Sequence, residues 1–170
     1  MAMPAPSGAD GPAERLAGQP GVQRAPTRTL ELFVVRGFLD PRQCAALAER
    51  IDARRRPSEI ADDIGIANYR TSETCDLDSK DPVVAEVEQR IAELLGLSLG
   101  ASEPLQAKEG GATRFKAIGK TIQPEAGKLL AWNNLLPDGR PNPATLHQGM
   151  KVRKGTKYVL TKWFRQRGAD

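Results

Sequence analysis

The last third of the chain alternates short β-prone stretches with turn residues, and this pattern limits the fold more than any other feature of the sequence. Gly, Pro and Asn recur between the apolar runs at intervals too short for long helices. The strands predicted from the pattern span residues 112–115, 120–122, 128–132, 145–152 and 157–164. Several short strands of this kind favour a β-sandwich.

Two amphipathic helices are predicted before these strands. In the first, Asp40 is the expected N-cap and Pro41 lies in the first turn. The second is expected to begin at Asp81-Pro82 and to end at Gly96. Their apolar stripes follow helical spacing and consist of Cys44, Leu47, Ala48 and Ile51, and of Val84, Val87, Ile91, Leu94 and Leu95. Helices followed by strands predict an α+β fold with both helices packed on one side of the sheet.

The first 28 residues are predicted to be a disordered tail, separate from a folded domain over residues 29–167. Fifteen of these 28 residues are Ala, Pro or Gly, and they show neither a helical nor a strand period. Such a segment buries too little apolar surface to offset the entropy lost on ordering. The domain is expected to start with a strand over 30–35, and extended segments are expected at 68–72 and 104–107.

Few side chains suited to metal binding or disulfide formation are present. The chain has one histidine, His147, and two cysteines, Cys44 and Cys75. A site with two histidines cannot form within one copy of the chain, and three His and Cys residues cannot complete a four-ligand zinc site. Two distant cysteines argue against a disulfide-rich secreted scaffold, so reduced thiols and a cytoplasmic location are expected. Cys44 lies on the apolar helix face, whereas Cys75 is expected in a polar loop.

Charge and hydropathy narrow the range of partners. The net charge is +4, and no apolar run reaches the roughly 18 residues that a membrane helix needs, so a membrane partner is not expected. The Arg54–Arg56 run is interpreted as a solvated helix end. Nucleic-acid binding is disfavoured because the basic residues have no interleaved aromatic platform. The oligomeric state stays open at this point.

A series of short motifs carries a resemblance to a known family. The motifs follow one another as Pro124-Glu-Ala-Gly127, Pro137-Asp-Gly139, His147, Lys157 ten residues later, and Thr161-Lys-Trp163. In this order they resemble the core of the prolyl 4-hydroxylase-like iron(II)/2-oxoglutarate dioxygenases. The helical part also fits, and the resemblance extends from about Leu32 to Arg167.

The resemblance implies a double-stranded β-helix (jelly-roll) core and an iron site. Enzymes of this class hold iron(II) with two histidines and one carboxylate, which leaves positions for 2-oxoglutarate and O₂. By the resemblance, His147 is an iron ligand and Lys157 pairs with the distal carboxylate of 2-oxoglutarate, and the two are expected on adjacent antiparallel strands. Tyr69, Arg70 and Ser72 match the segment that covers a peptide substrate. The implied reaction is hydroxylation of a peptidyl proline or similar residue, with ascorbate as a further cofactor.

The chain departs from the family pattern between Gln106 and Glu109. Family members carry a His-x-Asp pair on an earlier strand, which supplies the other histidine and the carboxylate. Here only Ala107 and Lys108 stand where several dozen residues are expected. We therefore expect an internal deletion near 106–109 and an incomplete jelly-roll core.

This departure leaves two functions open. The carboxylates nearest in sequence are Glu109, Glu125 and Asp138, and one imidazole with one carboxylate provides only two protein ligands for iron. The first function is a dioxygenase that acts on a peptide or protein substrate, although we expect this chain alone not to turn over 2-oxoglutarate. The second is a shortened, non-catalytic relative that binds a protein or peptide.

Overall fold

The computed structural model describes residues 11–57, 73–109 and 111–165, and within these ranges the chain is a mixture of helices and short antiparallel strands. The helical segments are α1 (Pro12–Ala17), α2 (Pro41–Asp52), α3 (Pro82–Leu95) and the 3-10 turns η1 (Leu99–Ala101) and η2 (Pro143–Thr145). The first five strands are β1 (Val22–Arg24), β2 (Leu32–Val35), β3 (Arg56–Pro57), β4 (Glu73–Asp76) and β5 (Gln106–Glu109). The other five are β6 (Thr113–Phe115), β7 (Lys120–Ile122), β8 (Leu129–Trp132), β9 (His147–Gly149) and β10 (Tyr158–Thr161).

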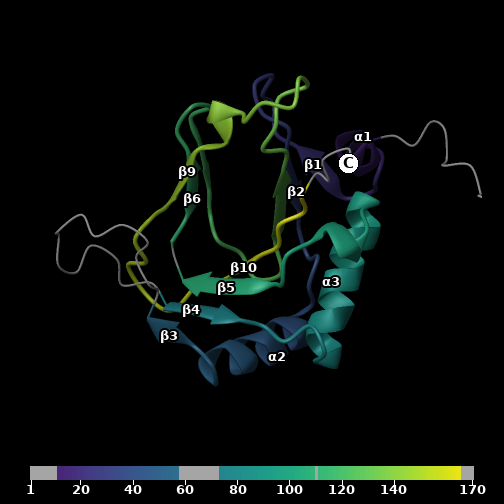
Figure 1. Cartoon of the computed structure of the whole chain (residues 1–170). Coiled ribbons are helices and arrows are strands. Elements are labelled where there is room, and N and C mark those ends of the chain that lie inside the picture. The colour runs from purple at the N-terminus through teal and green to yellow at the C-terminus, as the bar shows by residue number, and fades with distance from the viewer. Residues whose placement is uncertain (1–10, 58–72, 110, 166–170) are drawn as a thin grey trace, which may run out of the picture.

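The strands form separate antiparallel sheets within the described residues. Their orders are β1-β2-β8, β10-β5-β4-β3 and β7-β6-β9. In Figure 1, β6 and β9 stand on the left, β2 stands on the right, and β5 and β10 close the lower side of the space between them. The fold is α+β as predicted, and no sheet of the described residues closes into a barrel.

Both predicted helices are confirmed, with their caps. Asp40 accepts a hydrogen bond from the Gln43 backbone at 2.8 Å, and the Gln43 side chain accepts one from the Asp40 backbone at 3.1 Å. Asp81 accepts from the backbone of Val83 at 2.9 Å. Gly96 ends α3 in the left-handed conformation, with φ of 68°, as a C-terminal glycine commonly does.

The larger of two hydrophobic clusters lies between the helices and the β10-β5-β4-β3 sheet. It joins the apolar stripes of α2 and α3 to side chains of β4, β5 and their flanking residues, namely Cys75, Leu77, Leu105 and Ala107. Figure 1 shows both helices on the outer side of this sheet. The smaller cluster consists of Leu30, Leu32, Phe115 and Ala144, with Trp132 packed against it. The helices therefore cover one side of the sheet, as the sequence predicts.

Part of the predicted N-terminal tail is ordered, so this prediction is wrong for residues 11–28. Helix α1 buries Leu16, which is 3% exposed, and Arg15 donates a hydrogen bond to the carbonyl oxygen of Glu93 at the end of α3. Strand β1 pairs with β2. A single buried side chain produces no period in an Ala-, Pro- and Gly-rich segment, so tertiary contacts fix a structure that the local pattern does not reveal.

Cys75 also differs from its prediction. It lies on β4 rather than in a polar loop and is 1% exposed, within the larger cluster. Burial raises the pKa of its thiol. The predicted strand at 68–72 falls outside the described residues.

Candidate functional site

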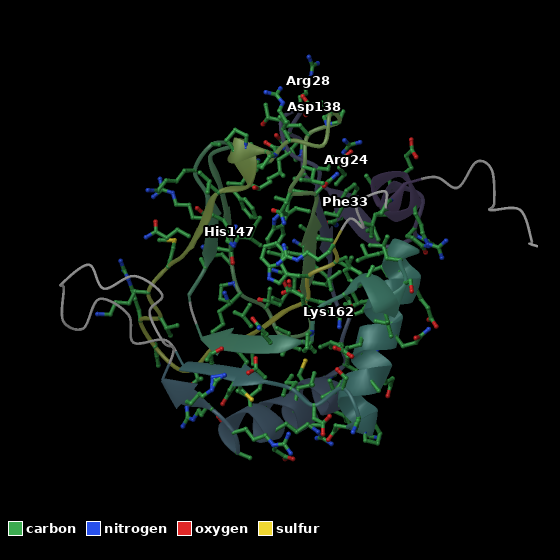
Figure 2. All side chains as sticks on the ribbon, in the orientation of Figure 1. Arg24, Arg28, Phe33, Asp138, His147 and Lys162 are labelled. Atoms are coloured by element: carbon green, nitrogen blue, oxygen red, sulfur yellow. The ribbon has the colours of Figure 1, made fainter. Side chains whose placement is uncertain are left out.

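His147 begins strand β9 and stacks its ring among aromatic side chains. Its ring centroid lies 5.0 Å from that of Trp132 and 5.4 Å from that of Phe115. Its Nδ1 lies 2.9 Å from the carbonyl oxygen of Thr145. The residue is exposed, and Figure 2 shows it on the β6–β9 side of the interior, opposite Phe33 and Lys162. One ring nitrogen, Nε2, is thus left for a ligand.

Local contacts hold this aromatic group in place. Phe115 faces His147 across the β6–β9 ladder, because the two residues are register partners. The turn before β9 is fixed by Asn142, whose side chain accepts from Ala144 at 3.0 Å and donates to the carbonyl oxygen of Thr29 at 2.9 Å. The cap and the strand pair therefore fix the orientation of His147.

Lys157 immediately precedes β10 and is half-buried. Its ammonium group donates a hydrogen bond to the carbonyl oxygen of Gly111, and desolvation by burial lowers its pKa. No Asp or Glu among the described residues forms an ion pair with it. A half-buried ammonium without an ion-pair partner among the described side chains is a suitable partner for a carboxylate ligand.

His147 and Lys157 do not lie on adjacent strands, so this prediction is wrong. Strand β9 pairs with β6, whereas β10 pairs with β5 in another sheet. The connection between the two strands passes through Gly155, whose φ of 75° allows the chain to turn from one sheet to the other. A tight turn in the sequence predicts a hairpin, but here the strands separate because each has a better partner elsewhere.

An open cleft lies between the sheets and contains both residues on its wall. Its volume is about 2700 Å³, and its lining includes every residue of β8, β9 and β10 together with Lys157. Small-molecule sites usually measure about 300–1,000 Å³. Native interiors hold few voids larger than a water molecule, so a space of this size is not part of a close-packed core.

The side chains present do not fit an iron(II) site of the two-histidine, one-carboxylate kind. No group of three His, Cys, Asp or Glu side chains suited to a metal occurs in the described residues, and His147 is the sole histidine of the sequence. Glu125 pairs with Lys128 at 2.8 Å, and Asp138 pairs with Arg140 at 2.7 Å. These two carboxylates are engaged with cations, and the side chain of Glu109 falls outside the described set.

The other predicted site residues, Tyr69, Arg70 and Ser72, lie outside the described residues.

Two features of the cleft were not predicted. The first is the Gly111 carbonyl group that accepts from Lys157, and the sequence gives no signal for a backbone contact of this kind. The second is the packing of Phe115 on His147, which the alternation of Thr113 and Phe115 on one strand could have suggested.

The chain belongs to the 2OG-Fe(II) oxygenase superfamily, whose family model matches residues 66–165. Its relatives place it among the prolyl 4-hydroxylase-like members. It is 29% identical over 147 residues to prolyl 4-hydroxylase subunit alpha-2 of Gallus gallus, with 62% of this chain and 28% of that protein covered. It is 26% identical over 155 residues to subunit alpha-1 of Homo sapiens, with 65% and 29% covered. The chain thus spans less than a third of the length of these relatives.

A solved structure shares the fold. The viral collagen prolyl hydroxylase of Paramecium Bursaria Chlorella virus-1, solved as a 2OG complex, superposes with a TM-score of 0.60 at 18% identity. The superposition covers 83% of this chain and 97% of the viral one. A truncated form of the same viral protein gives a TM-score of 0.56.

None of the described helices is both long and apolar enough to cross a membrane.

Proposed function

We propose that this chain is a non-hydroxylating, prolyl 4-hydroxylase-like domain that binds a peptide segment in its open cleft. The observation that carries the proposal is the incomplete ligand set around His147, the sole histidine of the sequence. A facial triad needs three protein ligands to hold iron(II) and leave positions for 2-oxoglutarate and O₂. Without a second histidine, Lys157 can still attract a carboxylate, but no oxidation follows. We place this function in the cytoplasm.

The length of the alignment with a relative supports the proposal. The alignment with the chicken subunit runs over 147 positions but covers 62% of the 170 residues here, which is about 105. About 42 positions of the relative therefore have no counterpart in this chain. Strands usually contain about 5–6 residues, so these positions, taken as one segment, would accommodate two strands and their connections.

The strand edges support the same interpretation. Strands β8, β9 and β10 each end a sheet and line the cleft along their whole length. Strands inserted beside them would pair with these edges and fill the space. We infer that the missing segment once occupied the cleft, and that its loss left a peptide-sized opening.

The relatives' names indicate the class of ligand. Prolyl 4-hydroxylase and collagen prolyl hydroxylase act on peptidyl proline, so a peptide or protein ligand is the natural extension to this chain. We further propose that the half-buried Lys157 pairs with a carboxylate of 2-oxoglutarate, although turnover and a need for ascorbate are not expected.

Succinate release from 2-oxoglutarate tests the proposal. The full chain is incubated with iron(II), 2-oxoglutarate and ascorbate, with and without a proline-rich peptide, beside a prolyl 4-hydroxylase as positive control. We expect no release above that of the His147→Ala variant, and no iron retained after gel filtration. Release that depends on His147 would instead make this chain an active dioxygenase.

A further inference from the structure

Among the described residues, strand β10 has a partner strand on one side only, and it lines the open cleft. It pairs with β5 on one side only, through register partners from Tyr158–Glu109 to Thr161–Gln106. No strand of the described residues pairs with its other edge. A free edge presents backbone N–H and C=O groups at the spacing of a sheet, and an extended peptide can add to it as a further strand.

Exposed apolar side chains flank β9 and begin β10. The large hydrophobic residues that are exposed in the described chain are Leu146 at 74%, Met150 at 40% and Tyr158 at 37%. They directly precede β9, directly follow it, and begin β10, and all three line the cleft. The Tyr158 hydroxyl donates to Asp52 at 2.9 Å, while Leu146 and Met150 offer apolar contacts along the β9 wall of the cleft.

The connection between β9 and β10, residues 150–157, is basic. The sequence from Gly139 to Arg165 contains no Asp or Glu. Arg140, Lys162 and Arg165 in this stretch have acidic partners. The remaining basic side chains form no ion pair with the described residues and line the cleft, and they are Lys151, Arg153, Lys154 and Lys157.

We propose that the cleft binds an extended acidic segment of another protein, which pairs with the free edge of β10 and directs its carboxylates to the 150–157 connection. This inference rests on the proposed peptide-binding function and names the class of peptide. Main-chain pairing provides affinity in such a complex, while the apolar side chains and the cations select an alternating apolar and acidic sequence.

Charge and size favour this occupant over the alternatives. A second copy of the chain carries the same basic connection and a net charge of +4, so two copies at this edge would repel each other. A volume of about 2700 Å³ exceeds the usual size of a small-molecule site. An oligonucleotide would satisfy the cations, but it has no backbone N–H and C=O groups to pair with the strand edge.

Peptide binding to the full chain tests the inference. The probe is a fluorescent peptide of about ten residues that alternates Val and Glu. One matched peptide carries Lys in place of Glu, and another carries Pro at every second Glu position, which prevents strand pairing. We expect the acidic peptide to bind at least about tenfold more tightly than either control. Equal binding of all three, or an oligonucleotide that binds more tightly than the acidic peptide, would overturn the inference.

A charge-reversal variant locates the site. Lys151→Glu/Arg153→Glu/Lys154→Glu changes exposed residues of the connection and is expected to weaken acidic-peptide binding about tenfold. The matched control, Arg28→Glu/Arg42→Glu/Lys80→Glu, changes the net charge equally at exposed residues outside the cleft. An equal loss in both variants would contradict the assigned site.

Hydrogen exchange then separates strand addition from simple charge attraction. The bound acidic peptide is expected to slow amide exchange within Tyr158–Thr161. Unchanged exchange there, or self-association of the free chain through this edge, would overturn the proposal. Succinate release by the chain would refute the non-hydroxylating function, whereas failure of the acidic peptide to bind would refute only this inference.

Discussion

At the scale of single residues, Lys157 links the family resemblance to the energetics of this chain. Its ammonium group is half-buried with a backbone carbonyl as partner, and burial lowers its pKa below 10.5. The resemblance identifies the residue, but the sequence does not show that its neighbour is a carbonyl group rather than a carboxylate. The kind of partner determines whether the pKa of Lys157 is lowered or raised in the folded chain. It therefore determines whether the free energy of unfolding rises or falls with pH.

Lys157→Met should change how stability depends on pH. Since the unfolded chain holds the Lys157 proton more tightly than the folded chain, the free energy of unfolding of the wild type rises with pH between the lowered pKa and 10.5. The variant lacks this increment, so the wild type should gain stability relative to it as pH increases. Urea unfolding at several alkaline pH values measures the difference, with Lys116→Met as an exposed control. A difference that is constant with pH would contradict the prediction.

The buried ion pair between Lys162 and Glu88 joins the residue that follows β10 to α3. The two charged atoms lie 2.6 Å apart, and both side chains are 6% exposed. Glu88 also accepts from the backbone of Leu105 at 3.1 Å. The pair therefore fixes the strand that borders the cleft against the helical layer.

Lys162→Met should destabilise the fold by about 3 kcal/mol, because it leaves a buried carboxylate without its cation. The double variant Glu88→Gln/Lys162→Met should recover much of this loss, since a neutral amide still accepts from Leu105. Arg140→Met breaks an exposed pair and should cost less than about 1 kcal/mol. Denaturant unfolding compares the three variants, and equal losses for Lys162→Met and Arg140→Met would refute the assignment.

At the scale of elements, Gly127 explains part of the Pro124–Gly127 motif. Its φ is 71°, and its carbonyl oxygen accepts from the backbone of Leu39 at 3.1 Å. A Cβ atom there would overlap the carbonyl oxygen of Leu39. The motif thus lets the turn before β8 approach the start of α2.

Gly127→Ala should be more destabilising than Gly119→Ala. Both positions have positive φ, which costs a non-glycine residue about 1–2 kcal/mol. Gly119 has open space around it, whereas Gly127 would also clash with backbone. The difference in melting temperature between the two variants measures the effect of the clash alone. Similar melting temperatures would argue against a close approach at Gly127.

The sequence predicts elements well where local signals determine them. Both long helices begin at their Asp-Pro pairs, and α3 ends at Gly96. Strand β7 occupies Lys120–Ile122 as predicted, and the other late strands are shorter than their predicted ranges. Helix α1 was missed because one buried leucine and a contact with α3 stabilise it. The partners of β9 and β10 depend on distant strands, so spacing alone could not reveal them.

At the scale of the whole molecule, the chain has two unequal cores around an open space. The cluster between the helices and the β10-β5-β4-β3 sheet contains ten buried residues, and the cluster beside β6 and β8 contains four. Apolar burial is the main favourable term in folding, so the larger cluster should remain folded when the smaller one opens. The candidate site lies beside both clusters, because His147 packs on the smaller cluster and Lys157 borders the larger one.

Native-state hydrogen exchange should reveal this difference. Amides of α3 are expected to exchange at least about tenfold more slowly than those of β9, whose three residues are all exposed. An acidic peptide in the cleft should first slow amide exchange in β10. It should also reduce the difference in exchange rate between α3 and β9, since it binds the folded arrangement of both walls. Uniform protection across α3 and β9 in the free chain would instead indicate a single cooperative unit, and the open cleft would then be as stable as the helical layer.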